Sequence, residues 1–320
     1  MTTPEGEVRA VPSWVPLAGA VLVGVLTATQ SRINGELGLR LGDGLVAAAI
    51  SFASGLVIVV LVGLCLRSGR HGLVRLAAGM KKRTIPWWML CGGLAGALTV
   101  ASQGLVAGII GVSLLTVGIV AGQTVGGLIF DRIGYGPAGA VAITVPRLAG
   151  GLLALVAVVI SLAFGPSGTS ASWWMIILPL LAGVGISWQQ ATNGRLRQRV
   201  DSAITATTVN FAGGTLILVL LAAVSVLARA EFPSLPPQSW LYLGGAVGVA
   251  YIAMSSAIVA RTGVLLMGLA VVVGQLTAAL VMDSVWPPLE RAGLWVELAT
   301  VGVALASVAV AAPWRRRRRA

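Results

Sequence analysis

Charged residues are scarce in this 320-residue chain: only 10% of its residues carry a charge, and ten of them are acidic. A soluble protein of ordinary composition has about 25% charged residues. Apolar residues make up 57% of the chain, and its mean hydropathy is +0.94. These values exclude a soluble protein and predict an integral membrane protein.

Cysteine and histidine are also sparse. Two cysteines and one histidine provide neither a disulfide framework nor a metal-ligand cluster. The sequence has no GxxxxGK[ST] segment and no soluble stretch long enough for an ATPase domain. It shows no nucleophile paired with a base and no paired acids of the kind that an active site requires. We therefore expect no enzymatic activity, no metal and no cofactor.

Segments that alternate apolar and polar residues over about ten positions are missing, which disfavours an outer-membrane barrel. Helices are the other way to satisfy every backbone group in hydrocarbon. Glycine is frequent, at 42 residues, and small residues let helices pack closely in lipid. Apolar stretches near the ~20-residue spanning length predict ten transmembrane helices, at about 14–33, 44–66, 86–107, 109–130, 139–164, 173–194, 203–228, 240–260, 263–285 and 292–312.

The chain is a duplication. Residues 30–55 recur without a gap at 189–214, so that Gln30, Asn34, Gly35, Phe52 and Gly55 reappear as Gln189, Asn193, Gly194, Phe211 and Gly214. After a seven-residue slip in the basic linker 67–84, a second block matches Trp88, Gly92, Gly96, Gly122, Gln123 and Asp131 to Trp240, Gly244, Gly248, Gly274, Gln275 and Asp283. Such self-similarity near half the chain length indicates two homologous halves. We expect a cytoplasmic segment at 1–13, repeats at 14–166 and 167–313, and a basic cytoplasmic tail at 314–320.

Five helices per repeat give the second half the opposite orientation in the membrane. The predicted fold is therefore an all-α membrane protein with ten transmembrane helices in two inverted five-helix repeats, an architecture of secondary transporters. Most Lys and Arg residues fall in short segments on the side of the N-terminus, which places both termini in the cytoplasm. Because this topology accounts for most of the +12 net charge, we interpret Arg315–Arg319 as a topology signal that meets anionic lipid, and expect no nucleic acid partner.

Polar residues inside the predicted spans are the strongest functional signal, since a polar group in hydrocarbon needs a partner or a function. Gln30 and Asn34 are four residues apart and share a helix face, which Gln189 and Asn193 repeat. The candidates for a substrate cavity are Gln30, Asn34, Phe52, Gln103, Gln123, Trp188, Gln189, Asn193, Asn210, Phe211 and Gln275. The alternative is that these amides only hold helices together. Asn34-Gly35 and Asn193-Gly194 can also mark helix ends.

Acidic residues give little indication of ion coupling. Glu297, near the outer end of the tenth span, is the one candidate for coupling, with an interfacial acid of no function as the alternative. Asp131 and Asp283 close the fourth and ninth spans and are interpreted as boundary residues. Gly118, Gly122 and Gly126 follow at intervals of four, a spacing that makes close helix crossings.

The motif Gln30-x-x-x-Asn34-Gly35-x-Leu37, followed by Ser51-Phe52-x-x-Gly55, with its copy at 189–214, resembles the DUF606-type family of small bacterial inner-membrane exporters in the drug/metabolite transporter superfamily. The resemblance covers nearly the whole chain and implies the fused two-repeat form, an EamA-like bundle. It implies that helices one to four and six to nine surround a central cavity, with five and ten peripheral. Asn210 in place of Ser51 and Ser255 in place of Gln103 make this cavity asymmetric.

We expect a multi-pass transporter of the bacterial cytoplasmic membrane that exports small metabolites or amphipathic compounds by alternating access. Its partners would be a small-molecule substrate and the lipid bilayer, and a homodimer stays open. A non-transporting membrane scaffold and a channel are the alternatives. A scaffold would bind no ligand, and a channel would not show exchange across the membrane.

Overall fold

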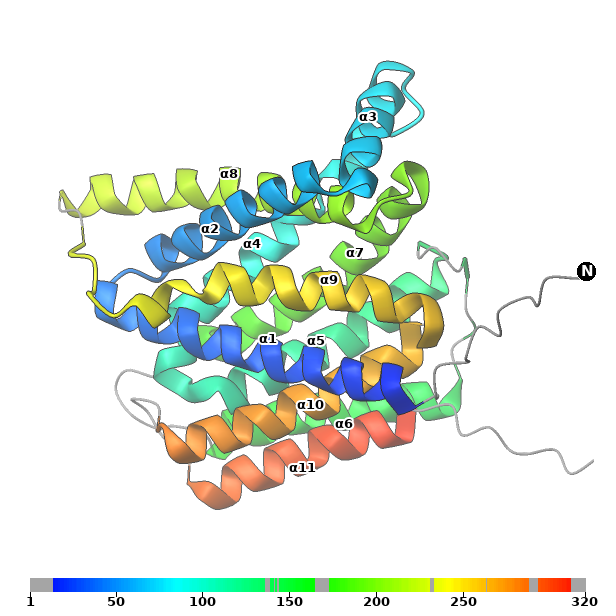
Figure 1. Ribbon diagram of the computed structural model, residues 1–320. Coiled ribbons are helices and arrows are strands. Elements are labelled where there is room, and N and C mark those ends of the chain that lie inside the picture. The colour runs from blue at the N-terminus through cyan, green and yellow to red at the C-terminus, as the bar shows by residue number, and fades with distance from the viewer. Residues whose placement is uncertain are drawn as a thin grey trace, which may run out of the picture.

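The computed structural model describes residues 14–135, 139–140, 142, 144–164, 173–230, 233–262, 264–287 and 293–311 (Figure 1). The terminal segments expected at 1–13 and 314–320 lie outside these residues. The described chain is helical, with α1 (Trp14–Leu41), α2 (Gly44–Cys65), α3 (Arg67–Lys81), η1 (Trp87–Leu90), α4 (Gly92–Ser102), η2 (Gln103–Ala107), α5 (Gly108–Arg132), α6 (Val145–Phe164), α7 (Trp174–Val200), α8 (Ala203–Arg229), η3 (Ser239–Tyr242), α9 (Gly244–Thr262), α10 (Val264–Val285) and α11 (Leu294–Ala311).

The helices have the length and composition of a membrane protein. Within the described ranges, five stretches are long and apolar enough to cross a membrane: Gly44–Cys65, Trp87–Ile110, Val112–Arg132, Trp174–Val200 and Ala203–Arg229. Shorter apolar helices accompany them at Leu148–Ile160, Gly244–Ser255, Ala270–Val285 and Leu294–Val310. The prediction of an all-α membrane protein is confirmed. All ten predicted spans have a helical counterpart.

The first helix of each repeat is longer than predicted. α1 continues to Leu41 and α7 to Val200, so the prediction that Asn34-Gly35 and Asn193-Gly194 mark helix ends is wrong. The reason is tertiary packing: a methyl group added at Gly35 would lie 2.7 Å from the backbone nitrogen of Gly108. Gly35 lets α1 approach Gly108 closely inside the membrane, and α1 continues through this position.

The two repeats use the same device to turn from their first helix into their second. Gly42 and Asp201, at equivalent positions, both have positive φ, of 64° and 52°. The next residue caps the following helix: Asp43 accepts hydrogen bonds from the backbone of Leu45 and Val46, and Ser202 accepts one from Thr205. Such caps satisfy amide groups that the first turn leaves free.

α2 and α8, the equivalent second helices, pack against each other in opposite directions. Near the start of α2, Asp43 accepts a hydrogen bond from Ser225 near the end of α8, at 2.5 Å. Beyond the other end of α2, Gly69 O accepts one from Thr205 near the start of α8. Because α1 and α7 lead into α2 and α8, these first helices end at opposite ends of the bundle. The repeats are therefore inverted about an axis that passes between α2 and α8.

The remaining contacts follow the same axis. α1 packs on α10 and α9. Its equivalent, α7, packs on the equivalents of those helices, α5 and α4. At the two equivalent crossings the backbones touch: a methyl group at Gly24 would lie 2.0 Å from Val271 O, and one at Gly183 would lie 2.1 Å from Ile119 O. Gly24 and Gly183 are repeat equivalents. The predicted role of glycine in close crossings is confirmed.

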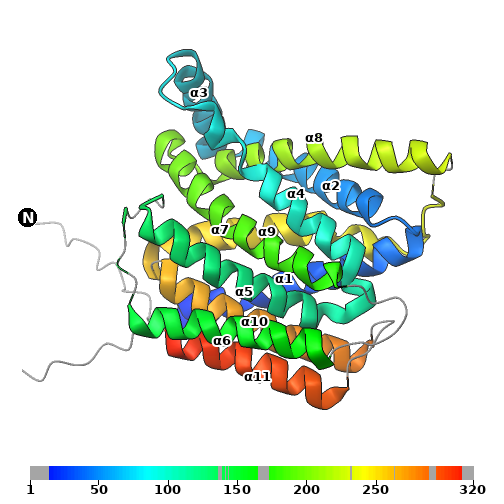
Figure 2. The same ribbon diagram turned by 180° about the vertical axis from the view of Figure 1, so that it is seen from behind.

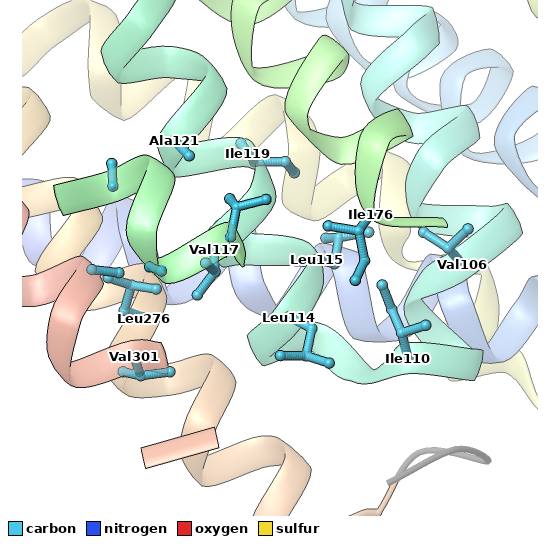
Figure 3. Close-up of a cluster of buried hydrophobic side chains, with 14 of the residues drawn as sticks. Val106, Ile110, Leu114, Leu115, Val117, Ile119, Ala121, Ile176, Leu276 and Val301 are labelled. Carbon is cyan, nitrogen blue, oxygen red and sulfur yellow. The ribbon is translucent and has the colours of Figure 1, made fainter. Parts of the chain in front are cut away.

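α6 and α11 pack on each other at one side of the bundle, as both views show (Figures 1 and 2). This agrees with the peripheral place that the family resemblance implies for helices five and ten. Between them and α7 lies an apolar core centred on α5, with side chains from η2 and α10 as well (Figure 3). Its members include Val106, Ile110, Leu114, Leu115, Val117, Ile119, Ile176, Leu276 and Val301.

The basic segment 67–84 is not the loop that the sequence analysis took it to be. Arg67–Lys81 forms α3, which runs across the direction of α2 and α8 and projects beyond them (Figures 1 and 2). Its apolar and polar residues separate onto two faces, whereas a spanning helix is apolar all round. The hydropathy pattern of ~20-residue spans misses such a short amphipathic helix.

Candidate functional site

Two phenylalanines mark the axis between the repeats. Phe52 of α2 and Phe211 of α8 are buried, and their ring centroids are 4.9 Å apart. Each ring lies against a glycine of the other repeat, Phe52 against Gly214 and Phe211 against Gly55. These contacts exchange repeat equivalents, so the axis passes between the two rings. We call this pair and the amides beside it the polar seam.

On the first-repeat side, α1 supplies the amides of the seam. Gln30 Nε2 donates to Gly244 O at 2.9 Å, and Asn34 Nδ2 donates to Gln103 Oε1 at 2.7 Å. Glycine at 244 and 248 makes room, since added methyl groups would lie 2.3 Å from Asn34 Oδ1 and 2.5 Å from Gln30 Nε2. Gln103 begins the π-helical turn η2, an irregularity often found at functional sites.

On the second-repeat side, the amides meet on one acceptor. Gln189 Nε2 and Asn193 Nδ2 of α7 both donate to Asn210 Oδ1 of α8, at 2.7 and 3.1 Å. Gly92 and Gly96 of α4 make room, as Gly244 and Gly248 do opposite. The seam thus joins Gln30, Asn34, Phe52, Gln103, Gln189, Asn193, Asn210 and Phe211, eight of the eleven predicted cavity residues.

The two sides place their hydrogen-bond acceptor on different helices. The first repeat has Ser51 on α2 and uses Gln103 as the acceptor for Asn34. The second repeat has Asn210 where Ser51 stands and Ser255 where Gln103 stands. The two substitutions therefore compensate: an amide acceptor lost from the third span of the repeat is regained on its second span.

The two sides also differ in exposure and in satisfied bonds. Gln30, Asn34 and Gln103 are at most 2% exposed, whereas Gln189 and Asn193 are half-buried. On the first-repeat side, three buried acceptors have no hydrogen-bond partner within the described part of the chain: Gln30 Oε1, Asn34 Oδ1 and Ser51 Oγ. Buried polar atoms are normally paired, so three unpaired acceptors in one place call for a functional explanation.

Toward the end of α1, beside and beyond its amides, lies a cluster of charged and aromatic residues, which we call the first mouth. It contains Arg32, Glu36, Arg40, Trp240, Asp283 and Trp286. Glu36 pairs with Arg40 at 2.8 Å and with Arg32 at 3.7 Å. The Arg32 guanidinium lies 4.7 Å from the Trp286 ring centroid, a cation–π contact.

Asp283 anchors the first mouth to the backbone of the other repeat. Its buried carboxylate accepts hydrogen bonds from Val112 N at 3.0 Å and Ser113 N at 2.6 Å. These amides are available because the helix breaks at Gly111, where φ is 88°. The interpretation of Asp283 as a boundary residue is therefore incomplete: it joins α10 to α5.

The second mouth lies beside the amides of α7, toward the end of that helix. It contains Trp88, Phe130, Tyr135, Trp188, Thr192 and Arg195. The Arg195 guanidinium lies 4.7 Å from the Tyr135 ring centroid and donates to Gly134 O. Tyr135 Oη accepts from the Trp188 indole at 3.1 Å and bonds Thr192 at 3.0 Å. Trp188, predicted as a cavity wall, thus lies in the second mouth.

Gln123, Gln275 and Glu297 lie apart from both the seam and the mouths. Gln123 and Gln275 follow the crossing glycines Gly122 and Gly274 on α5 and α10. Gln275 is buried and its Nε2 has no partner in the described chain, while Gln123 O accepts from Ser187. Glu297 is buried on α11, at the side formed with α6.

Apart from Trp188 and Asp283, the sequence analysis did not assign the mouth residues. One signal was present: Glu36 and Arg195 occupy equivalent positions, as do Trp240 and Trp88. Comparing the repeats for identical residues misses the first pair, because an acidic residue in one repeat corresponds to a basic residue in the other.

The two repeats are inverted, a polar seam lies on their axis and a charged and aromatic cluster lies at each end, an arrangement that is typical of membrane transporters. The family model described as "Putative inner membrane exporter, YdcZ" matches residues 15–160 and again 174–311, so the chain belongs to this family. The fused two-repeat form that the resemblance implied is confirmed, and the family is one of exporters rather than of enzymes.

Other comparisons add little. A solved structure described as "Crystal structure of protein" is 19% identical over 96% of this chain and 98% of that chain, with a TM-score of 0.49. No curated protein matches the chain.

Proposed function

We propose that the protein is a secondary transporter that exports small metabolites or amphipathic compounds across the cytoplasmic membrane by alternating access. The observation that carries this proposal is the equivalence of the two mouths. They stand at opposite ends of an inverted pair of repeats, with one polar seam between them. In secondary transporters built in this way, substrate binds near the midplane, where the repeats meet.

The seam has the chemistry for a solute with hydrogen-bond donors and an apolar part. The unpaired acceptors Gln30 Oε1, Asn34 Oδ1 and Ser51 Oγ fit N–H or O–H donors of a solute. Phe52 and Phe211 offer apolar contact beside them. No buried charge belongs to the seam in the described structure, so a neutral or weakly charged solute fits best.

The exposure of the two sides indicates which way the present conformation faces. Gln189 and Asn193 are half-buried while Gln30 and Asn34 are buried, so the seam is more accessible at the second mouth. α7 ends at this mouth, and the distribution of Lys and Arg places that end in the cytoplasm. We infer that this conformation takes up solute from the cytoplasm, and that closing the second mouth and opening the first releases it outside.

A thermal-shift screen of the purified protein against metabolites and drugs, at two pH values, tests binding and proton linkage together. Flux of each hit is then measured in proteoliposomes. A transporter gives saturable counter-flow, which an open channel does not. If no compound stabilises the protein and none is transported, the amides act only in packing and the scaffold alternative holds.

Replacing Gln189 or Asn193 with leucine is expected to reduce transport of a hit by about twofold to tenfold. Each variant removes a donor from a half-buried position, and one hydrogen bond to a solute contributes about 0.5–1.5 kcal/mol, up to roughly a tenfold effect. Uptake into proteoliposomes measures this effect, and a thermal unfolding scan verifies that the variants fold. Gln123→Leu is the comparison. If it abolishes transport while the other two variants do not, the site lies at the α5–α7 crossing instead.

A further inference from the structure

α3 has no helical counterpart in the described part of the second repeat, where residues 233–238 lead into η3. It holds four of the Lys and Arg side chains that give this end of the molecule its charge: Arg67, Arg70, Arg75 and Lys81. The helix therefore distinguishes one membrane surface of the protein from the other. Its orientation decides what those side chains face.

Packing against the bundle fixes that orientation. A methyl group at Gly69 would lie 2.1 Å from Gly63 O of α2, and one at Gly72 would lie 2.2 Å from Thr205 Oγ1 of α8. Thr205 also donates to Gly69 O at 3.3 Å. The glycine side of α3 therefore rests directly on α2 and α8, and the helix cannot rotate without losing this contact.

The opposite face is basic with an apolar side chain among the charges. Arg67, Arg70, Val74 and Lys81 follow at spacings of three, four and seven residues, which place them on one helix face. All four are exposed, Val74 by 68%. Since α3 runs across the spanning helices at the end of α2, it lies along the membrane surface (Figures 1 and 2). A basic helix of this kind binds at the headgroup level.

An apolar cavity of about 230 Å³ lies beneath α3, between α2 and α8. Its lining includes Val60, Gly63, Leu73, Ile204 and Thr208. Leu73 belongs to α3 and neighbours Arg70, whose Nη1 donates to Leu64 O and Cys65 O at the end of α2. These bonds hold the guanidinium beside the cavity and leave its other N–H donors for a further acceptor.

We propose that α3 and this cavity form a binding site for one anionic phospholipid. An acyl chain occupies the cavity between α2 and α8, and the phosphate group meets Arg67, Arg70 and Lys81. The juxtaposition of the apolar cavity with the basic face favours a lipid over free phosphate, because each part binds one half of the same molecule. The site is independent of the polar seam and of any transported solute.

The headgroup half of the proposal is tested with purified protein in detergent, titrated with phosphatidylglycerol, phosphatidylcholine or inorganic phosphate. Bound lipid is counted by native mass spectrometry. We expect phosphatidylglycerol to bind at least tenfold more tightly than phosphatidylcholine, because each Lys or Arg near a membrane surface attracts anionic lipid. The double variant Arg67→Gln, Lys81→Gln is expected to lose most of this preference.

Arg75→Gln is the matched control for charge. Arg75 lies on another face of the same helix, where it pairs with Asp201 at 2.7 Å. Exposed pairs contribute little to stability, so this variant is expected to fold and to bind phosphatidylglycerol within about twofold of the unaltered protein. An equal loss in Arg75→Gln and the double variant would show general charge attraction and overturn the assigned face.

The acyl-chain half is tested by filling the cavity. Thr208→Phe places a ring where the chain would lie, whereas Leu216→Phe adds a ring to an exposed position of the same helix. Retention of phosphatidylglycerol is expected to fall at least fivefold in Thr208→Phe and to stay unchanged in Leu216→Phe. Unchanged retention in Thr208→Phe, or equal competition by inorganic phosphate, would overturn the proposal.

Discussion

Gly122→Ala is expected to lower the yield and the unfolding temperature of the folded protein strongly. The added methyl group would lie 1.9 Å from Leu180 O, which is a backbone atom of α7 and cannot rotate away as a side chain can. The two helices would have to separate, and overpacking of this kind costs about 1–3 kcal/mol or more. Since the folding free energy of a protein is only about 5–15 kcal/mol, such a loss at the main α5–α7 contact is large. Size-exclusion chromatography and thermal unfolding measure it.

Gly127→Ala is the matched control on the same helix. An added methyl group there meets nothing within 4 Å. Because alanine favours the helix over glycine by up to about 1 kcal/mol, this variant is expected to be as stable as the unaltered protein or slightly more so. If Gly122→Ala unfolds at the same temperature as Gly127→Ala, the backbone contact between α5 and α7 is not a determinant of the fold.

The repeat makes the same experiment available at the other crossing. Gly274 is the equivalent of Gly122, and a methyl group there would lie 2.1 Å from Val21 O of α1. Gly274→Ala is therefore expected to be as damaging as Gly122→Ala. These two crossings are the main contacts of α1 and α7, the helices that carry the amides of the seam. Glycine at these points sets how close Gln30 and Gln189 come to the axis.

The inverted fold could be predicted from the sequence because it depends on residues that recur at a constant offset and on the number of apolar spans. A constant offset between Gln30 and Gln189, or between Gly122 and Gly274, is a property of the sequence alone. The number of apolar spans then decides the relative orientation of the halves. Neither step needs to know which side chains touch.

The site could be predicted only in part, because contacts across the axis depend on exact packing. The repeated amides were identified, but their bonds to Gln103 and Asn210 appear only when α1 is placed against η2 and α7 against α8. Asp283 was interpreted as a boundary residue because it lies near a helix end. The sequence does not show that its carboxylate faces backbone amides of α5. Helix α3 was missed because a short basic segment resembles a loop in hydropathy.

Asp283→Ala is expected to have the second large effect, on transport as well as on stability. Its carboxylate binds the amides of Val112 and Ser113, where the break at Gly111 exposes the positive end of the remaining α5 helix. Arg32 is also buried nearby and is attracted to it. Removing one member of a buried charge cluster costs about 3–5 kcal/mol, because the other charge loses its partner. Thermal unfolding of Asp283→Ala beside Ser284→Ala, an exposed neighbour, measures this loss.

Asp283→Asn separates a structural role from a role in transport. Asparagine keeps one acceptor and the side-chain volume, so the variant is expected to fold, with one of the two amides unpaired. We expect transport per folded molecule to fall at least tenfold, because Asp283 joins the two repeats at the first mouth, where one repeat must move against the other. A variant that unfolds earlier but transports at the normal rate per folded molecule would contradict this role. Asp283 would then only cap the broken α5 helix. Opening of the first mouth would depend instead on Glu36 and its two arginine partners.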